Sequence, residues 1–361
     1  MERADLHRPL RRGWTTGTCA AAASRAAYEA LLTGTFPDPV SVLLPGGARP
    51  AFALATSERG GDFARAGIVK DAGDDPDVTH GALIVATVRL AAPGAGVLFR
   101  AGEGVGTVTR PGLPLAPGEP AINPVPREMI RTAIAEAAAL FGGSGDAIVE
   151  LSIPGGAKIA ERTLNGRLGI VGGLSVLGTT GIVVPYSCSA WIHSIHRGID
   201  VARAAGLDHI AGATGSTSEA AIARLLGLPD AALIDMGDFV GGMLKYLRRH
   251  PIPRVTIAGG MAKMTKLGQG LLDLHSRRGE VDLGWLSRVA AGLGGDAALA
   301  AQIERANSAM DAFAAAEAAG IGLPGGVAAA AWKTAAHALG DGMHLEIAIF
   351  GRSGELLARV H

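Results

Sequence analysis

The stretch HIAGATGSTSEAAIARLLGLPDAALIDMGDFVGGMLKYLRRHPIPRVTIA, residues 209–258, decides the fold class. It holds three short apolar runs, at 209–211, 231–234 and 254–258, and each run is followed by a segment typical of a helix. Strands that alternate with helices predict βαβ units, whose strands lie parallel in one sheet. We therefore expect an α/β region here.

The residues before this stretch predict a different, α+β organisation. An alanine-rich helix is expected from Thr18 to Thr33, with threonine hydroxyls at its start and Gly34 just past its end. A second helix is expected to begin at Pro126. Glycine, proline and aspartate separate the strand candidates, which suits a mixed or antiparallel sheet. These candidates are residues 40–44, 51–56, 64–69, 82–90 and 147–153.

The predicted fold class is therefore α/β, with an α+β first region and an α/β second region that contains a parallel sheet. We place the first region at 1–188 and expect it to bind the substrate, because it holds most of the glycine-rich motifs. The second region, 189–340, is the candidate cofactor side. Residues 341–361 predict two strands, which are candidates for returning to the first region.

Composition excludes several classes of protein. Of the residues, 48% are hydrophobic, which excludes wholesale disorder, and the 53 glycines have no period of three, which excludes collagen. The 33 basic and 33 acidic residues cancel, and only 4% of residues are aromatic. A neutral chain poor in aromatic residues does not favour a nucleic acid as partner.

The cysteines, two histidines and one uncharged segment allow predictions about the cellular compartment, metal binding and membrane insertion. Cys19 and Cys188 cannot build a disulfide framework or a multi-thiolate metal site, so a reduced, cytoplasmic protein is expected. His193 and His196 have no third ligand at a telling spacing, so no metal is expected. Residues 168–192 carry no charge but contain five glycines. We expect buried strand and loop there, and no membrane span.

The segment TTGTC, residues 15–19, combines a tight turn with the start of a helix whose first residues are small. Free N–H groups and hydroxyls at a helix N-terminus bind anions, so Thr15, Thr16 and Thr18 are candidate substrate ligands. The alternative is a capped helix whose alanines pack closely on a neighbour. Taken alone, the segment favours this alternative.

Acidic residues are concentrated in KDAGDDPDVTHG, residues 70–81. Asp71, Asp74 and Asp75 are candidate catalytic residues, because a carboxylate can stabilise positive charge on a substrate or remove a proton. Four carboxylates within seven residues repel one another. We therefore expect that they are not all paired locally and that at least one faces a cleft. A solvated Asx-turn loop explains the pattern equally well.

Two further segments of the first region carry candidate substrate ligands. GEGVGTVTRPGL, residues 102–113, lacks the strand–helix frame of a nucleotide-binding loop. It predicts instead a glycine-rich hairpin that lets the backbone approach a flat ligand, with Arg110 beside it. GEPAINPVPR, residues 118–127, places Asn123 and Arg127 at a helix start. A guanidinium there is suited to pairing with a carboxylate.

Two glycine-rich turns follow predicted strands of the second region. GATGSTSE, residues 212–219, opens a helix with Ser216 and Glu219 at capping-box spacing, and AGGMAKMTKLGQG, residues 258–270, opens another. In an open parallel sheet, ligands bind where strand ends meet helix starts. Either turn alone is equally explained as structural, whereas the two together favour a small-molecule site. The candidate cofactor ligands are Gly212, Gly215, Ser216, Gly259 and Gly260.

Taken in order, these segments resemble the cobalt-precorrin-5B C1-methyltransferase family of cobalamin biosynthesis, CbiD. The motifs that carry the resemblance are GWTTGTCAAAA, KDAGDDPDVTHG, GEGVGTVTRPGL, GEPAINPVPR, TLNGRLGIVGGLSVLGTTGIVVPYS, GDFVGGMLKYL and KLGQGLLDLHSRRGEVD. From Gly13 to Asp282 they cover about three quarters of the chain. Each motif is weak alone, and the ordered set is highly specific.

The resemblance implies an enzyme of EC class 2.1.1 that uses S-adenosyl-L-methionine as cofactor. The implied substrate is a ring-contracted, cobalt-bearing corrinoid precursor, methylated at C1. The family's catalytic residues are not transferred to this chain, so the site residues named above rest on the chain's own pattern. A homo-oligomer is left open.

Two alternatives from other classes also stay open. One is a phosphate-handling enzyme that uses the TTGTC turn as its anion site, which stoichiometric nucleotide binding would favour. The other is a non-catalytic tetrapyrrole-binding carrier, which would bind the macrocycle but not S-adenosyl-L-methionine.

Overall fold

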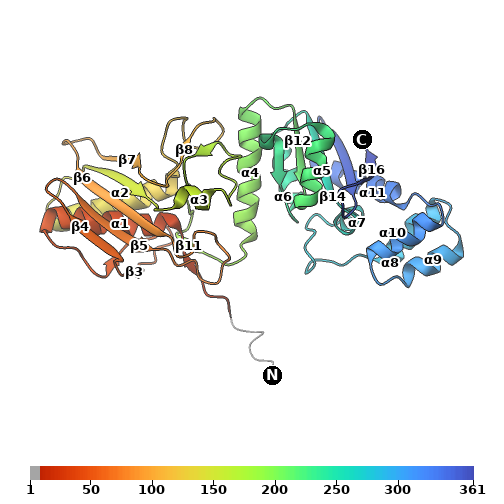
Figure 1. Cartoon of the computed structure of the whole chain (residues 1–361), viewed down its shortest axis with the longest axis horizontal. Coiled ribbons are helices and arrows are strands. Elements are labelled where there is room, and N and C mark those ends of the chain that lie inside the picture. The colour runs from red at the N-terminus through yellow and green to blue at the C-terminus, as the bar shows by residue number, and fades with distance from the viewer. Residues whose placement is uncertain (1–8) are drawn as a thin grey trace, which may run out of the picture. The chain divides into compact units, whose positions relative to one another are not determined.

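The computed structural model describes residues 9–361, and the chain divides after Ser187 into two compact units (Figure 1). The first unit is built on a five-stranded sheet in the order β4–β5–β6–β9–β7. Its neighbours pair antiparallel except β7 and β9, which are parallel. The strands are β4 (Thr56–Arg59), β5 (Ala64–Val69), β6 (Leu83–Leu90), β7 (Val97–Ala101) and β9 (Ala147–Ser152).

Two long helices pack on this unit. Helix α1 (Thr16–Thr33) contacts β5 and β6, and α2 (Pro124–Phe141) packs on α1. Small residues allow the close approach: a Cβ added at Gly17 would lie 2.8 Å from the ring of Pro126. The alanines of α1 are consequently buried almost throughout. The sequence predicts this helix correctly, with Gly34 ending it at a φ of 84°.

Shorter elements surround the start of α1. Strand β1 (Gly13–Trp14) pairs with β11 (Ile182–Val183), and β8 (Thr107–Val108) pairs with β10 (Ile170–Val171). The remaining short elements are β2 (Val40–Ser41), β3 (Ala51–Phe52) and α3 (Gly156–Ala160). The β1–β11 pair brings the glycine-rich chain before Ser187 back to the first turn of α1, although the two are far apart in sequence. Strands β2 and β3 are shorter than predicted.

The second unit holds a five-stranded sheet in the order β13–β12–β14–β15–β16. All neighbouring pairs are parallel except β15 and β16. The predicted parallel sheet is therefore present. The strands are β12 (His209–Ala213), β13 (Leu233–Asp235), β14 (Arg254–Gly260), β15 (His344–Phe350) and β16 (Leu356–Val360).

Helices cover both faces of this sheet, because successive strand residues point to opposite sides. Ile210 and Ile257 join the larger core with the helices that include α6 and α7, whereas Ala211 and Ala258 join a smaller core under α5. The helices of the unit are α4 (Cys188–Ala204), α5 (Ser216–Leu226), α6 (Val240–Leu247), α7 (Met261–Gly268), α8 (Leu283–Gly292), α9 (Ala297–Glu304), α10 (Ala309–Ala318) and α11 (Leu323–Leu339), with a 3-10 turn at Asp230–Ala232.

The C-terminal strands correct one prediction. Strand β15 lies parallel to β14, and β16 pairs with β15, so residues 341–361 complete the second sheet and do not return to the first region. Strand β15 is buried along nearly its whole length, as in a parallel sheet covered on both faces. An apolar run identifies such a strand, but it does not name the strand's partner.

The uncharged stretch 168–192 contains β10, β11 and the first residues of α4. Across the part of the chain that the structure describes, no helix is both long enough and apolar enough to cross a membrane.

Candidate functional site

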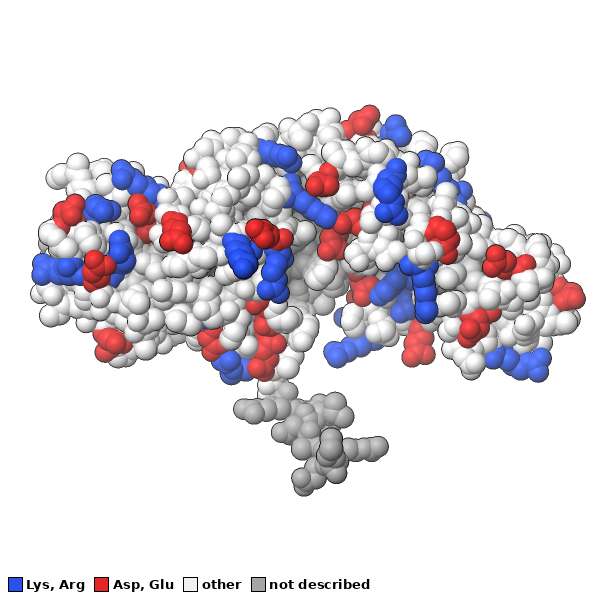
Figure 2. Space-filling view, in the orientation of Figure 1, with Lys and Arg blue, Asp and Glu red and all other residues white. Residues whose placement is uncertain are grey.

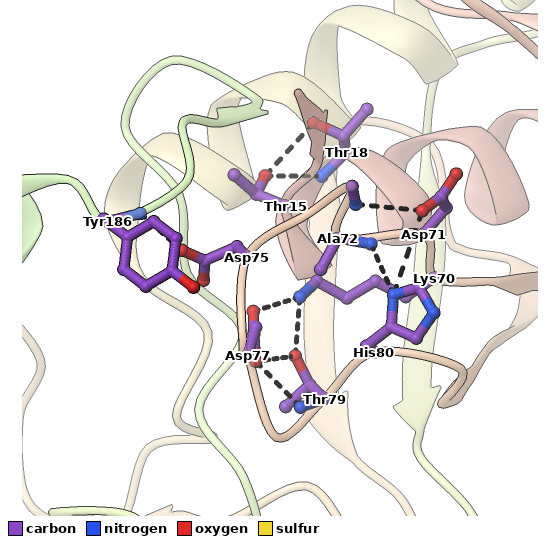
Figure 3. A network of polar contacts seen from close by, with 11 residues as sticks. Thr15, Thr18, Lys70, Asp71, Ala72, Asp75, Asp77, Thr79, His80 and Tyr186 are labelled. Carbon is purple, nitrogen blue, oxygen red and sulfur yellow. Dashed lines mark hydrogen bonds and ion pairs between the residues drawn. The ribbon is translucent and has the colours of Figure 1, made fainter. Parts of the chain in front are cut away.

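The acidic loop between β5 and β6 is organised around a buried lysine (Figure 3). The Lys70 side chain is 1% exposed, and its Nζ donates to the Asp77 carboxylate and to Thr79 Oγ1, the latter at 2.6 Å. Burial acts to raise the pKa of Asp77, but the Lys70 charge and hydrogen bonds from Lys70 and Thr79 outweigh it and lower that pKa. The ion pair between Lys70 and Asp77 therefore holds the loop in place.

Asp71 is held by a different cation. Both its oxygens accept from the Arg11 guanidinium, one of them at 2.9 Å from Nη2, and the Gly73 N–H donates to Oδ1 at 2.9 Å. The hydrogen bonds from Arg11 and then Gly73 lower the Asp71 pKa to about 2. His80 lies alongside, with Nδ1 accepting from the Ala72 N–H at 3.1 Å. Asp71 is thus an anion at neutral pH and a weak proton acceptor.

The other two candidate catalytic carboxylates bind backbone. The Arg11 N–H donates to Asp74 at 2.6 Å. The Tyr186 N–H donates to Asp75 Oδ1 at 2.8 Å, and these two residues are labelled in Figure 3. Tyr186 is the one non-glycine residue with a positive φ, 55°, among residues 9–361. All four acidic side chains therefore have hydrogen-bond partners. Those of Asp71, Asp74 and Asp75 include donors from Arg11 and Tyr186, which lie far from the loop in sequence, so the four are not all paired within the loop, as the repulsion among them predicts.

The loop nevertheless borders an open pocket of about 440 Å³. Its lining residues are Gly73, Asp74, Asp75, Pro76, Asp77, Val78, His80 and Arg162. Arg162 is exposed, and no hydrogen bond or ion pair of its side chain is seen among the described residues. The pocket thus joins three carboxylates to one unpaired guanidinium. Sequence reasoning does not connect Arg162 with this loop, because it lies far from Asp77 along the chain.

The TTGTC turn is bonded within the chain. Thr15 Oγ1 accepts from the Thr18 N–H at 3.2 Å, and the Thr18 hydroxyl donates to the Gly181 carbonyl at 2.7 Å. The Gly17 N–H donates to the Leu177 carbonyl at 3.0 Å, and Thr15, Thr16 and Thr18 are all buried. The N–H groups of Thr15, Gly17 and Thr18 and the Thr18 hydroxyl are thus used by the protein itself. A capped, closely packed helix is what the structure shows.

The predicted substrate ligands at the other two motifs differ in whether their side chains are already bonded within the protein. Arg127 donates from Nε to the Ile122 carbonyl at 2.8 Å and from Nη1 to Glu119 at 3.1 Å, and its side chain is 14% exposed. It therefore braces the chain that enters α2. Asn123 precedes that helix without capping it through its side chain. Arg110 is exposed, and no side-chain hydrogen bond or ion pair is seen for it within residues 9–361.

In the second unit, the two predicted turns follow the carboxyl ends of the neighbouring strands β12 and β14. The sheet order is β13–β12–β14–β15, so the connection that leaves β12 runs to β13 on one side and the connection that leaves the neighbouring β14 runs to β15 on the other. Such a switch point is where open α/β sheets bind ligands, at the carboxyl ends of the strands. Gly215 and Gly260 lie there, each directly before a helix, and an added Cβ at either would meet no atom within 4 Å.

The other predicted cofactor residues have different environments. An added Cβ at Gly212 would lie 2.4 Å from Met243 Sδ, and one at Gly259 would lie 2.6 Å from Met264 Sδ. These two glycines are buried and serve packing. Ser216 is exposed but makes no capping bond, so the capping box predicted with Glu219 is absent.

A charged cluster that the sequence does not single out lies next to the switch point. Asp238, in the turn after β13, accepts from Lys263 Nζ of α7. The Nζ atoms of Lys263 and Lys266 both donate to the Leu274 carbonyl, at 3.2 and 3.3 Å. Lys263 and Lys266 lie in the second glycine-rich turn, whereas the sequence pattern predicts no role for Asp238.

The remaining candidates for a nucleophile or a metal ligand are a buried cysteine and the histidines of α4. Burial raises the pKa of the Cys19 thiol to about 12, which makes it a poor nucleophile. His196 stacks on Tyr246 at a ring separation of 3.9 Å. Within residues 9–361, no group of three His, Cys, Asp or Glu side chains is placed to hold a metal ion.

Comparison with known proteins covers both units. The CbiD family matches residues 3–185, and the CbiD C-terminal domain matches residues 273–361. A protein of Bradyrhizobium sp. (strain BTAi1 / ATCC BAA-1182), named cobalt-precorrin-5B C(1)-methyltransferase, is 65% identical over 99% of this chain and 96% of its own length. This chain belongs to the CbiD family.

Two further relatives and one solved structure are similar to this chain over most of its length. Proteins with the same printed name from Agrobacterium fabrum and Methylorubrum extorquens are 65% and 63% identical over 97% of this chain, and over 93% and 97% of their own lengths. The crystal structure of cobalamin biosynthesis protein (cbiD) from Archaeoglobus fulgidus is 28% identical, covering 74% of this chain and 83% of that one, with a TM-score of 0.41.

Surface charge is mixed over the face drawn in Figure 2, where acidic and basic side chains are interspersed. This face therefore offers an anionic ligand individual cations and not one extended basic patch.

Proposed function

We propose that this chain transfers a methyl group from S-adenosyl-L-methionine to C1 of cobalt-precorrin-5B in cobalamin biosynthesis. The observation that carries the proposal is the near full-length identity, 65%, to a CbiD protein that bears the corresponding name. Both compact units fall within that alignment, which spans 99% of the chain. The proposal therefore concerns the whole protein.

The second unit supports binding of the methyl donor. Gly215 and Gly260 leave open space at the switch point of a parallel sheet, where a side chain would otherwise intrude. Ser216 is exposed at the start of α5 and can offer its hydroxyl and N–H. When bound, S-adenosyl-L-methionine supplies an electrophilic methyl on a sulfonium. The chain's task there is to hold that methyl in line with the accepting carbon.

The first unit supports binding of the corrinoid. The carboxylates on the rim of the corrinoid need cationic partners, because charge-assisted hydrogen bonds are stronger than hydrogen bonds between neutral groups. Arg110 and Arg162 are exposed and have no protein partner among the described residues, so both can serve without breaking an existing bond. Arg127 would first have to give up its bond to Glu119. We therefore assign carboxylate binding to Arg110 and Arg162.

The aspartates of the loop are proposed to have two different roles. Asp74 and Asp75 border the pocket with Arg162, and either carboxylate can stabilise positive charge that develops on the ring as C1 accepts the methyl. Asp71 binds Arg11 and has a pKa of about 2, so it is assigned a positioning role. A group with so low a pKa does not remove protons effectively at neutral pH.

The test is to incubate the purified protein with S-adenosyl-L-methionine and cobalt-precorrin-5B and to follow both products by mass spectrometry. One added methyl on the corrinoid, with equal formation of S-adenosyl-L-homocysteine, is expected. A protein that binds the corrinoid but neither binds the donor nor forms either product would be a carrier. Bonding of the Thr15, Gly17 and Thr18 N–H groups within the chain gives less support to the phosphate-handling alternative, and stoichiometric nucleotide binding would favour it.

A further inference from the structure

The ion pair between Asp238 and Lys263 lies at the switch point of the second sheet. Asp238 follows β13, and Lys263 is in the first turn of α7, directly after β14. Because β12 is the strand between β13 and β14, the pair bridges the carboxyl end of β12. The N–H groups of Met236 and Gly237 donate to the Ala213 carbonyl at 3.1 and 3.2 Å, which ties the Asp238 turn to that strand end.

The cluster has an excess of positive charge. Lys266 is 7% exposed, and its Nζ contacts the Leu274 carbonyl, which Lys263 Nζ also contacts. Among the described residues, the carboxylate of Asp238 pairs with Lys263, and no carboxylate is seen to pair with Lys266. Burying a cation without a countercharge is costly, so a site of this composition favours an additional anionic group.

The pair also keeps unused hydrogen-bonding capacity. An ammonium has three N–H donors, and Lys263 uses two of them, on Asp238 and Leu274. The bond from Lys263 involves Asp238 Oδ1, and no hydrogen bond to Oδ2 is seen within residues 9–361. The side chains are 34% and 20% exposed, so a ligand at the switch point can reach both.

We propose that Lys263 and Asp238 bind the zwitterionic amino-acid end of the adenosyl sulfonium donor, with its carboxylate on Lys263 and its ammonium on Asp238. The inference rests on the proposed function and deepens it. Two opposite charges held side by side match a ligand end that carries both. The buried charge of Lys266 adds attraction for the carboxylate.

Comparison of two ligands on the unaltered protein tests this without any substitution. S-Adenosyl-L-homocysteine carries the amino-acid end, whereas 5′-methylthioadenosine has the same adenosine and thioether without it. Calorimetry should show S-adenosyl-L-homocysteine binding at least about tenfold more tightly, the equivalent of one charge-assisted hydrogen bond. Equal affinities overturn the inference while leaving the donor assignment intact. Binding of neither ligand would overturn the donor assignment and the inference with it.

Two substitutions then assign the residues. Lys263→Met and Asp238→Asn nearly preserve side-chain shape and should each weaken S-adenosyl-L-homocysteine binding about tenfold or more, with less than about twofold change for 5′-methylthioadenosine. Arg288→Met is the matched control, because it removes the exposed Arg288–Asp282 pair on α8, at 3.4 Å, and should change neither affinity. A purely structural pair predicts equal losses for both ligands, or none, and either result overturns the inference.

Discussion

The buried Lys70–Asp77 pair predicts an asymmetric response to removing its two charges. Lys70 is 1% exposed and Asp77 is 26% exposed. Asp77→Asn leaves an ammonium that water cannot reach, whereas Lys70→Met leaves a carboxylate that water partly solvates. Leaving a buried charge without its partner costs about 3–5 kcal/mol. Asp77→Asn keeps an acceptor oxygen, so we expect the low end, about 3 kcal/mol. For Lys70→Met we expect about 1 kcal/mol, the worth of a lost hydrogen bond.

Urea unfolding of the full chain near neutral pH gives the free energy of unfolding of each variant. Glu58→Gln is a suitable control, because the Arg65–Glu58 pair lies on the surface and should contribute less than about 1 kcal/mol. The double variant with both Lys70→Met and Asp77→Asn should be close to Lys70→Met alone. If Lys70→Met costs as much as Asp77→Asn or more, the reasoning from burial is refuted.

The same pair predicts a pH dependence. The folded-state pKa of Asp77 is lowered, so its contribution to stability is present above its unfolded-state value, about 3.9, and is lost as the pH falls through the folded value. The stability gap between the unaltered protein and Asp77→Asn should therefore narrow in acid. A gap that stays constant from neutral pH to below about pH 4 would show that the carboxylate charge is not its cause.

Three further substitutions separate structural from functional residues. Gly215→Val should leave stability unchanged, because an added Cβ meets no atom within 4 Å, but it should weaken S-adenosyl-L-homocysteine binding at least about tenfold. Gly212→Val should instead destabilise the fold by about 1–3 kcal/mol. The reverse pattern would contradict the placement of the donor at Gly215. Arg110→Ala should weaken corrinoid binding about tenfold or more, whereas Arg127→Ala should mainly lower the melting temperature; a larger binding loss for the second variant would move the carboxylate site to it. Asp75→Asn should bind both ligands normally yet transfer methyl about 10²-fold more slowly, and full activity would make this carboxylate structural only.

Local signals in the sequence predict much of this fold. The alternation over residues 209–258 correctly predicts the parallel sheet, and the alanine run before Gly34 correctly predicts α1. Each signal lies within the element it predicts, as an apolar period or a cap. The partner of β15 was not predictable in this way, because strand pairing depends on residues far apart in the chain.

The site was predicted only in part for the same reason. The sequence predicts the aspartate loop and the local Lys70, but not the donors from Arg11 and Tyr186, which lie far from the loop in sequence. The glycine turns after β12 and β14 were located, yet separating the open Gly215 from the buried Gly212 requires knowing which side chains pack against them. Composition and spacing identify candidate residues, whereas three-dimensional packing decides which of them a ligand can reach.

Transfer of a labelled methyl group tests the central claim most directly. S-Adenosyl-L-methionine carrying carbon-13 in its methyl group is incubated with cobalt-precorrin-5B and the protein, and the product is examined by nuclear magnetic resonance. The proposed function predicts one labelled methyl bonded to C1, formed with the unaltered protein and strongly reduced with Gly215→Val. An unlabelled corrinoid, or a label attached at any other ring carbon, would contradict it.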